Sequence, residues 1–413
     1  MKIKGPILLT LLLVLAGGGS LLLRGHQMKE DAPESPAIHW RDSLNRRLTN
    51  DLSSLPQMDA VIDSFMDFWT LHGVSLAVMR NDSLLYARGY GMAGERTPMT
   101  PGTTLRLASV SKLLTAVGIM RLQEEGKLFL DTPVFGPLGI LKKYDSYIKD
   151  DNYYLITVEH LLRHQAGFTS RGGDPVFSPY TSLDALLRKQ LGRWLAFEPG
   201  TYQEYSNFGF LLLSLVIEEV SGLSYEEFMQ KEVFEPALCR DFRIAGNYLS
   251  DRHPGESRYW MQPDAELTTS FDGRYSAVPK CYGGNNITGS QGAGGWTGSA
   301  PELARIVACI DGKGPVEDIL DPFSVSQMTT YFDPDTFSLG WNDTKPSGEW
   351  TRSGSFSGTQ ALIKTYPDGE CWIFISNTSA WRGTRFSHNI AALFKNLRGR
   401  FSEKLPRRDL FRE

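Results

Sequence analysis

Cysteine is scarce in this chain, with four residues among 413. So few cysteines exclude a small scaffold held together by disulfides, and none has the spacing of a metal-binding motif. Cys309 and Cys371 fall in apolar segments and are predicted to be buried as small hydrophobic side chains. Cys239 and Cys281 are left as the pair that an oxidising compartment would allow to form a disulfide.

An excess of charge of one sign is also missing, since 43 Lys and Arg face 47 Asp and Glu, a formal net charge of −4. Without a basic field the chain has no means of attracting nucleic acid, so no nucleic-acid partner is expected. The hydrophobic share of 41% and the charged share of 22% are those of a globular protein. At this length we expect two domains or one large two-part domain.

Several familiar site signatures are absent or out of place. No G-x-S-x-G occurs, which argues against an α/β-hydrolase. Residues 89–94 fit G-x-G-x-x-G, but residues 95–98 read Glu-Arg-Thr-Pro rather than the start of a helix, so a dinucleotide site is not indicated. His160 and His164 have the i, i+4 spacing of zinc ligands, yet no glutamate lies between them and no third ligand is apparent. We therefore expect packed helix residues there, and no metal or cofactor.

The amino terminus carries the pattern of an exported protein. Lys2 and Lys4 precede an uncharged, leucine-rich run over residues 5–23, and Arg24 ends it. A short basic segment followed by an apolar one is typical of a signal peptide, and a run of this length can also span a bilayer. Residues 1–24 are therefore predicted to be a cleaved signal peptide or a membrane anchor, with the anchor slightly favoured. Either interpretation places the rest of the chain outside the cytoplasm, on the periplasmic or surface side, and leaves the oligomeric state open.

Strand patterns lie near both ends of the remaining chain. Residues 74–79 and 84–90 are strand-like and flank a four-residue turn, and residues 360–366 and 371–376 flank Pro367-Asp368-Gly369. Helical periodicity marks the segments between and beside them, at residues 109–123, 158–164, 183–191, 207–220, 225–233 and 386–397. We therefore predict an α+β fold, with one antiparallel sheet built from both chain ends, flanking helices and a mostly helical insert.

Three boundaries follow from the same patterns. Residues 25–55 are polar, hold Pro33 and Pro36, and are predicted to be a tether. Residues 56–400 are predicted to form the folded part, and residues 401–413 a polar tail. The glycine-rich segment 283–296 is expected to be a loop.

Ser109 and Lys112 form an S-x-x-K pair at the start of an apolar helix. Residues three apart share a helix face, so the lysine amine can reach the serine oxygen and activate it as a nucleophile. The free N–H groups of a first helical turn also favour a developing anion. Taken alone, the pair is better interpreted as an N-cap serine with a solvated lysine. A second S-x-x-K pair, Ser146 and Lys149, is interpreted as two surface residues. The motifs that follow favour Ser109 as a nucleophile.

Tyr205-Ser206-Asn207 follows a turn at residues 199–201 and precedes an apolar helix. If Tyr205 faces Ser109, its oxygen can act as a general base and then as a general acid. Tyrosine and lysine have ordinary pKa values near 10, too high for a base at neutral pH, so nearby cations or burial must lower them. Asn207 is predicted to hold Lys112 and a substrate carbonyl; its alternative role is a simple helix cap.

Arg352-Ser353-Gly354-Ser355 precedes the strands at the carboxy-terminal end. A small strand residue such as Gly354 lets a substrate approach the backbone closely, and the Ser355 N–H can pair with the Ser109 N–H as an oxyanion hole. We therefore predict, together with the other motifs, that these four residues contact substrate, although the segment considered alone is better interpreted as a turn with a solvated arginine.

In this order the three motifs resemble those of the serine β-lactamase-like family, which includes class C β-lactamases, D-Ala-D-Ala carboxypeptidases of the penicillin-binding type, D-aminopeptidases and family VIII esterases. The resemblance covers about residues 56–400. Further matching segments are Leu107–Lys112, Ile156–His164, Phe197–Gly222, Gly292–Trp296 and Leu339–Trp341. It implies a β-lactamase/transpeptidase-like fold with Ser109, Lys112 and Tyr205 as the catalytic residues. Arg352 departs from the family, which usually has Lys or His there; arginine can bind a substrate carboxylate with two hydrogen bonds but cannot shuttle a proton.

The predicted function is therefore that of an exported serine hydrolase that works through an acyl-enzyme. The substrate is expected to be a small molecule or peptide, first a D-amino-acid peptide of the cell wall or a β-lactam-like compound. Two alternatives stay open. One is an esterase of the same fold, and the other is a non-catalytic sensor or scaffold that binds cell-wall peptides, to which Arg352 points.

Overall fold

The computed structural model describes residues 43–177, 182–330 and 336–413. The predicted signal or anchor at residues 1–24 and the first part of the predicted tether lie outside these ranges. Within them, no single helix is long and apolar enough to cross a membrane, while the bent pair Asn207–Ser221 and Tyr225–Phe234 meets the length and composition criteria together.

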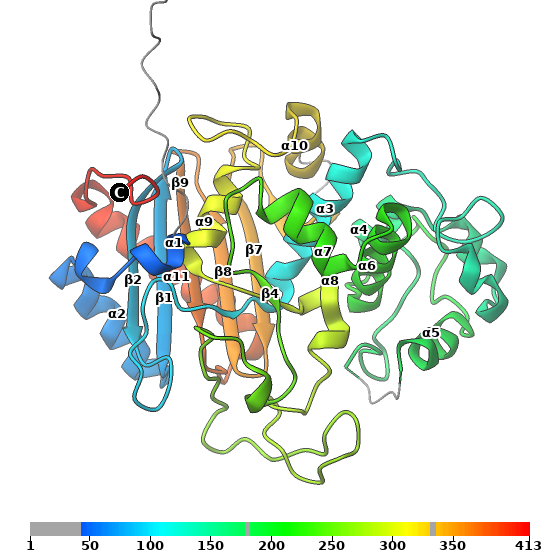
Figure 1. The fold of residues 1–413 in the computed structure, drawn as a ribbon, viewed down its shortest axis with the longest axis horizontal. Helices are drawn as coiled ribbons and strands as arrows, with labels where there is room; N and C mark the ends of the chain where they lie inside the picture. Colours follow the sequence, from blue (N-terminus) through cyan, green and yellow to red (C-terminus); the bar gives the residue numbers. More distant parts are fainter. Residues whose placement is uncertain (1–42, 178–181, 331–335) are drawn as a thin grey trace, which may run out of the picture. The chain divides into compact units, whose positions relative to one another are not determined.

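A six-stranded antiparallel sheet joins segments from near both ends of the chain. Its order is β2-β1-β9-β8-β7-β6, and in Figure 1 the blue strands β1 and β2 lie beside the orange strands of the carboxy-terminal part. The junction is the antiparallel pair β1–β9, in which Ala77 lies opposite Ile373. The strands are β1 Gly73–Arg80, β2 Ser83–Gly91, β6 Asp343–Thr344, β7 Trp350–Phe356, β8 Thr359–Thr365 and β9 Glu370–Ser376. The predicted sheet assembled from both chain ends is confirmed.

Both faces of this sheet are covered by helices, which explains why β1 and β9 are apolar along almost their whole length. Helices α2 (Pro56–Trp69) and α11 (Phe386–Phe401) pack on the face that carries Leu76 and Phe374. Helix α9 (Ala300–Ala308) packs against β1 and β9 on the other face. Seven of the eight residues of β1 and all seven of β9 are buried, so neither strand shows the alternation of a sheet with one wet face.

Most of the remaining helices form the predicted insert beside the sheet. They are α3 Ser111–Glu124, α4 Val158–Leu162, α5 Leu183–Leu191, α6 Asn207–Ser221, α7 Tyr225–Met229, α8 Gln291–Gly294 and α10 Pro322–Thr329. A small three-stranded sheet, in the order β3-β5-β4, connects this part to the nucleophile segment. Its strands are β3 Leu105–Arg106, β5 Trp296–Gly298 and β4 Arg243–Ile244. The segment predicted as a loop at 283–296 contains α8, so that prediction is wrong at its end.

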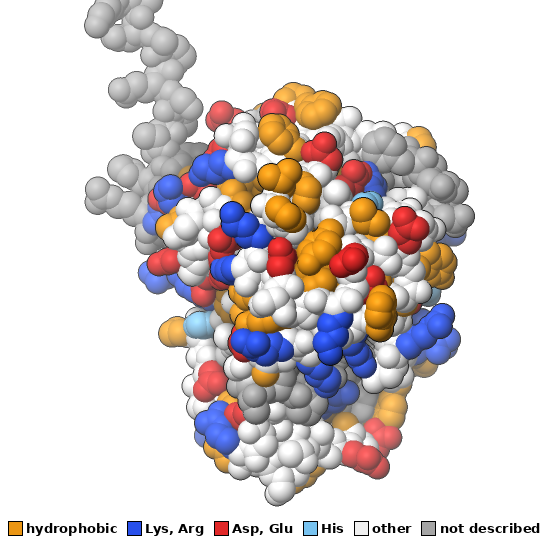
Figure 2. All heavy atoms as spheres, turned by 90° about the vertical axis from the view of Figure 1, so that its right-hand side faces the viewer, with side chains coloured by type: hydrophobic (Ala, Val, Ile, Leu, Met, Phe, Trp, Pro, Cys, Tyr) orange, Lys and Arg blue, Asp and Glu red, His pale blue; other side chains and the backbone are white. Residues whose placement is uncertain are grey.

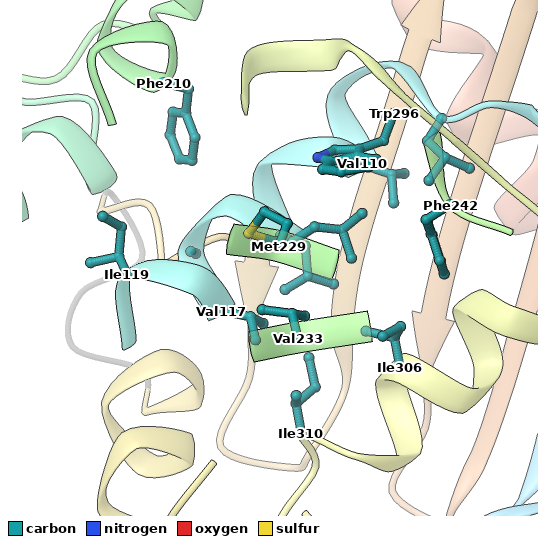
Figure 3. Close-up of a cluster of buried hydrophobic side chains, with 14 of the residues drawn as sticks. Val110, Val117, Ile119, Phe210, Met229, Val233, Phe242, Trp296, Ile306 and Ile310 are labelled. Carbon is teal, nitrogen blue, oxygen red and sulfur yellow. The ribbon is translucent and has the colours of Figure 1, made fainter. Parts of the chain in front are cut away.

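Helix α3 lies at the centre of the molecule and has almost no solvent face. Eleven of its 14 residues are buried, including the polar residues Ser111, Lys112 and Thr115. Figure 3 shows Val117 of this helix beside Val233, within a cluster that also holds Met229 and Ile310. A helix enclosed in this way must satisfy each polar side chain with an internal hydrogen bond, because water does not reach it. This requirement determines the surroundings of Lys112.

The predicted tether and tail both extend too far into the folded part. Residues 44–47 form helix α1 (Leu44–Arg47), and Leu44 and Leu48 are buried in the main core. At the other end, Leu410 and Phe411 are buried, and the Leu410 N–H donates to the Leu84 carbonyl oxygen at 2.8 Å. Few apolar residues in a polar stretch give a weak sequence signal, yet they are sufficient to anchor each segment.

The four cysteines are all free and buried. The Cys239 thiol lies beside the carbonyl oxygen of Glu302, whereas Cys281 packs with Tyr259 and Tyr282 in a separate small cluster. The open pairing of Cys239 with Cys281 is therefore wrong. Burial of Cys309 and Cys371 is confirmed.

The side of the molecule formed by the helical insert carries charges of both signs. Figure 2 shows Asp and Glu side chains among the hydrophobic ones, and Lys and Arg side chains gathered in the lower part of this face.

Candidate active site

A strained turn presents Ser109 between β3 and α3. Ala108 has a φ of +49°, a left-handed conformation that costs a residue with a Cβ about 1–2 kcal/mol. Ser109 lies in the short 3-10 turn Ala108–Val110, and the α-helix begins two residues later than predicted, at Ser111. The turn leaves the Ser109 side chain partly exposed while its neighbours Ala108 and Val110 are buried. Backbone strain of this kind is typical of functional sites.

The structure brings Ser109, Lys112 and Tyr205 together. The Lys112 Nζ lies 3.2 Å from the Ser109 Oγ, and the Tyr205 hydroxyl donates to the same oxygen at 2.8 Å. Ser109 comes from the 3-10 turn before α3, Lys112 from the first turn of α3, and Tyr205 from the segment just before α6. Ser109 and Tyr205 are 96 positions apart in the sequence. The serine oxygen therefore contacts two groups that can exchange its proton.

Lys112 is completely buried and uses all three of its ammonium donors. Besides Ser109, it donates to Asn207 Oδ1 at 2.6 Å and to the carbonyl oxygen of Ala293 in α8. Burial lowers the pKa of Lys112, and the nearby charge of Arg352 lowers it further. The lysine thus stays positioned by fixed acceptors while its proton becomes easier to remove.

Tyr205 has a pKa below its usual value, because two cations outweigh its burial. Burial alone raises the pKa of this tyrosine, but the charges of Lys112 and Arg352 and the hydrogen bonds of the site lower it. Tyr205 also stacks against Lys112, whose Nζ lies 4.9 Å from the ring centroid. A tyrosine hydroxyl tuned in this way, 2.8 Å from the serine oxygen, satisfies the geometry of a general base.

Arg352 is enclosed by the protein, so the predicted contact with a substrate carboxylate is wrong. Its side chain is buried, with 1% exposure, and its Nε donates to the Ser109 carbonyl oxygen at 2.8 Å. A second donor, Nη2, contacts the same oxygen. A guanidinium that is enclosed and already bound to a carbonyl cannot form the two-pronged contact with an incoming carboxylate. Arg352 instead holds the backbone of the Ser109 turn through this carbonyl oxygen. It also adds positive charge beside Tyr205.

Strand β7 lies against the backbone of the nucleophile turn. Arg352 and Gly354 are buried, while Ser353 and Ser355, on the opposite face of the strand, are partly exposed. A Cβ on Gly354 would lie 2.3 Å from the Leu107 carbonyl oxygen and 3.0 Å from the Ser109 nitrogen. Only glycine permits this approach. The roles of Ser353 and Ser355 toward substrate stay predictions.

Asp174 is a site residue that the sequence analysis did not identify. The Asn207 amide nitrogen donates to Asp174 Oδ2 at 2.6 Å, and the negative charge of Asp174 acts on Lys112. Asn207 therefore bridges the lysine and a carboxylate rather than the lysine alone. A single aspartate in a loop carries no periodicity or motif, so no sequence signal could have located it.

His164 is the second missed residue, since it was interpreted as helix packing. Its ring lies 4.5 Å from that of Tyr205, centroid to centroid. Its Nδ1 accepts from the Ser206 N–H at 3.1 Å, and its carbonyl oxygen accepts from the Glu204 N–H at 3.0 Å. His164 thus holds the residue on each side of Tyr205. Burial and the charges of Lys112 and Arg352 keep its pKa well below the usual value, so the imidazole is neutral.

The antiparallel sheet is built from both chain ends, and the S-x-x-K pair Ser109 and Lys112 lies where α3 begins. Together these features define a serine hydrolase of the β-lactamase/transpeptidase-like fold. Residues 58–395 match the Beta-lactamase family. The chain belongs to that family, and its members are serine hydrolases.

Similar proteins agree with this assignment. Penicillin-binding protein 4* of Bacillus subtilis (strain 168) is 31% identical over 207 residues, 48% of this chain and 43% of that protein. Protein flp of Staphylococcus aureus (strain MW2) is 28% identical over 248 residues, 55% of this chain and 48% of that protein. The chain thus spans under half the length of these relatives. The D-amino acid amidase of Ochrobactrum anthropi SV3, in complex with D-phenylalanine, shares the fold with a TM-score of 0.64 at 18% identity, over 86% of this chain and 99% of the amidase.

Proposed function

We propose that this chain is an exported serine hydrolase that cleaves an amide or ester through an acyl-enzyme on Ser109. The observation that carries the proposal is the contact of one serine oxygen with both Lys112 and Tyr205, at 3.2 and 2.8 Å. Membership of the Beta-lactamase family supports the same chemistry.

The reaction has two halves. Tyr205, as the tyrosinate stabilised by Lys112 and Arg352, accepts the Ser109 proton while Oγ attacks the substrate carbonyl carbon. The backbone N–H groups of Ser109 and Ser355 stabilise the oxyanion. As the tetrahedral intermediate collapses, the Tyr205 hydroxyl returns the proton to the leaving amine or alcohol, and the acyl ester on Ser109 remains. Water then attacks this ester, Tyr205 again transferring the proton, and the acid leaves.

The first substrate class to test is a D-amino-acid peptide of the cell wall or a β-lactam that mimics one. Two lines support this choice: the similarity to penicillin-binding protein 4* and the export pattern of residues 1–24. A simple ester is the second class, because the same serine and tyrosine act on any activated carbonyl.

The experiment is intact-mass analysis of the full chain in mild detergent after exposure to a fluorescent penicillin and, separately, to a fluorophosphonate. We expect an adduct that maps to the Ser109 peptide and disappears in Ser109→Ala. The matched control is Ser146→Ala, which removes the exposed serine of the other S-x-x-K pair and should label normally. Reaction with the fluorophosphonate alone would favour an esterase.

Folded protein that reacts with neither probe would contradict the proposal and favour the non-catalytic, peptide-binding alternative. The variant Arg352→Lys addresses that alternative directly, because it restores the residue type usual in the family. Sharply higher turnover in this variant would indicate that the native site is adapted to binding.

A further inference from the structure

A groove outside the active site is bordered by residues of α3, α4 and α10. Its volume is about 560 Å³, within the range of pockets that hold small molecules. Ser109, Lys112 and Tyr205 are not among the residues that line it. Two aromatic side chains in its wall, Phe129 and Phe323, are 58% and 68% exposed. Two such side chains in one groove form an apolar surface of the kind that marks a binding site.

Hydrogen bonds between the two sides of the groove fix its shape. Near the end of α3, the Gln123 Nε2 donates to the Gln327 Oε1 of α10 at 2.7 Å. The backbone N–H of Asp321, the residue before α10, donates to the Glu124 Oε1 at 2.7 Å. Because these contacts hold α10 against α3, a ligand would meet a preformed site and would lose little free energy in ordering it.

The lining of the groove is acidic. Its charged residues are four acids and one base, namely Glu124, Asp131, Glu159, Asp321 and Arg163. Glu124 pairs with Arg121, which lies outside the lining. Glu159 pairs with Arg163. Asp131 and Asp321 have no ion pair with the residues that the structure describes. A ligand cation would therefore be attracted to the groove, and it would also be stabilised by the faces of the aromatic rings.

A buried hydroxyl in the same groove lacks a partner. Ser324 of α10 lines the groove and is 1% exposed, yet its Oγ has no hydrogen-bond partner among the described residues. An unsatisfied buried polar group costs free energy, which a polar group of a ligand would recover. This observation is independent of the acidic residues and indicates a ligand in the same place.

Arg163 connects the groove with the active site. Its Nε donates to Glu159 Oε1 at 2.7 Å, and its Nη1 donates to the Phe337 carbonyl oxygen at 3.1 Å. The Phe337 ring packs edge-on against His164 and Tyr205, with centroid distances of 4.9 and 6.1 Å. A ligand cation that binds Glu159 would compete with Arg163 and so loosen the residue that packs against Tyr205.

We propose that this groove binds a cation that carries an apolar ring or chain, such as an arylalkylammonium group, and that its occupation slows the reaction at Ser109. The carboxylates bind the cation, and the rings of Phe129 and Phe323 contact the apolar part. The effect reaches Tyr205 through Arg163 and Phe337. This site goes beyond the proposed function, because no step of the hydrolase reaction uses it.

The first test is a titration of the full chain in mild detergent, followed by ligand-observed NMR. The probes are 4-phenylbutylammonium, the neutral 4-phenylbutanol and the anionic 4-phenylbutyrate, of which the ammonium should bind most tightly and the carboxylate most weakly. The Kd of the ammonium should rise roughly 3- to 10-fold in Asp131→Asn and in Phe323→Ala. The matched controls Asp151→Asn and Phe68→Ala, at exposed residues outside the groove, should leave it unchanged. No preference for the cation, or a Kd that neither groove variant alters, would overturn the proposal.

The second test compares the rate of fluorophosphonate labelling at Ser109 with and without saturating 4-phenylbutylammonium. We expect slower labelling in the native chain and, at the same ammonium concentration, a smaller effect in Asp131→Asn. Competition at the active site would also slow labelling, but Asp131→Asn would not relieve it. Binding that left the labelling rate unchanged would overturn the regulatory role. Failure of Ser109 to label at all would instead contradict the proposed function, and the titration, which needs no nucleophile, would still decide whether the groove binds the cation.

Discussion

Arg352 donates to the backbone carbonyl oxygen of Ser109, at 2.8 Å from its Nε, and thereby holds the turn on which the nucleophile lies. The same guanidinium adds positive charge beside the hydroxyl of Tyr205. Arginine at this position is therefore suited to two fixed tasks, support of the turn and electrostatic tuning of the base. Neither task requires it to lose a proton.

The charge of Arg352 should determine the pH at which the enzyme becomes active. Because this charge lowers the pKa of Tyr205, its removal in Arg352→Met should raise that pKa. The rate requires the tyrosinate, so the acidic limb of the kcat/KM profile should move to higher pH by roughly 1–3 units. Arg352→Lys keeps the charge and should leave the limb near its native position. If the pH profiles of kcat/KM were the same for Arg352→Met and Arg352→Lys, the electrostatic role of Arg352 would be contradicted.

Gly354 should tolerate no larger residue. In Gly354→Ala the new Cβ meets the Leu107 carbonyl oxygen at 2.3 Å and the Ser109 nitrogen at 3.0 Å, and both are backbone atoms that can move only with the nucleophile turn. We expect kcat/KM to fall roughly 100-fold and the free energy of unfolding to fall by about 1–3 kcal/mol. The measurements are steady-state kinetics and urea unfolding.

Gly399→Ala is the control for that substitution. This glycine lies inside α11, and nothing is within 4 Å of an added Cβ. The change should leave kcat/KM unchanged and stabilise the protein by up to about 1 kcal/mol, because alanine has the higher helix propensity. Normal activity in Gly354→Ala would show that β7 can move away from the Ser109 turn to accommodate the Cβ, and would contradict the prediction.

Asp311 should make the protein less stable as the pH rises. Burial, together with the charge of Asp82, raises its pKa to about 7 in the folded protein, against about 3.9 in an unfolded chain. The folded state therefore binds this proton more tightly, so the stabilising effect is complete below pH 4 and is lost as the pH rises to 7. Asp311→Asn should be more stable than the native protein above pH 7, by up to about 4 kcal/mol.

That stability difference should shrink toward zero at pH 4, as followed by urea unfolding across the range. The control is Asp343→Asn, the same substitution at an exposed residue of β6. Lys313 lies 3.8 Å from Asp311 and Asp318 is also close, so the double variant Asp311→Asn, Lys313→Met separates the aspartate from its ion pair. A difference independent of pH would contradict the assigned pKa.

The sequence analysis succeeded for elements whose pattern repeats over many residues. It failed for parts of the site that depend on a single residue or on one backbone atom. The predicted helix over 183–191 matches α5 in both bounds, and the hairpin over 74–90 matches β1 and β2 closely, because periodicity in these segments involves many residues. Ser109, Lys112 and Tyr205 were selected by spacing and order, and the structure brings their side chains together; their catalytic roles stay predictions.

The missed parts of the site have no such signal. Ala293 acts through its carbonyl oxygen, which every residue possesses, and Asp174 lies in a loop between glycines and a proline. The direction of Arg352 was also predicted wrongly, because a guanidinium that faces substrate and one that faces the Ser109 carbonyl have the same sequence. Only the packing of β7 against the nucleophile turn decides between them.

His164 should position Tyr205 without contacting substrate. His164→Leu removes the acceptor of the Ser206 N–H, at a cost of about 1–3 kcal/mol for the unsatisfied group, together with the ring stack on Tyr205. His164→Asn retains an acceptor and a residue type that tolerates the left-handed φ of +59°, but it loses the stack. We expect kcat to decrease in the order native, Asn, Leu, with KM nearly constant, because the displaced group acts on the Ser109 proton.

His160→Asn is the matched control for His164. Its imidazole also accepts a backbone N–H, from Thr157 at 3.2 Å, but it belongs to the capping box of α4 rather than to the surroundings of Tyr205. This variant should lose some stability and keep its kcat. If the folded fraction of His164→Leu, quantified by fluorophosphonate titration, turned over at the native kcat, His164 would be purely structural and the positioning role would be wrong.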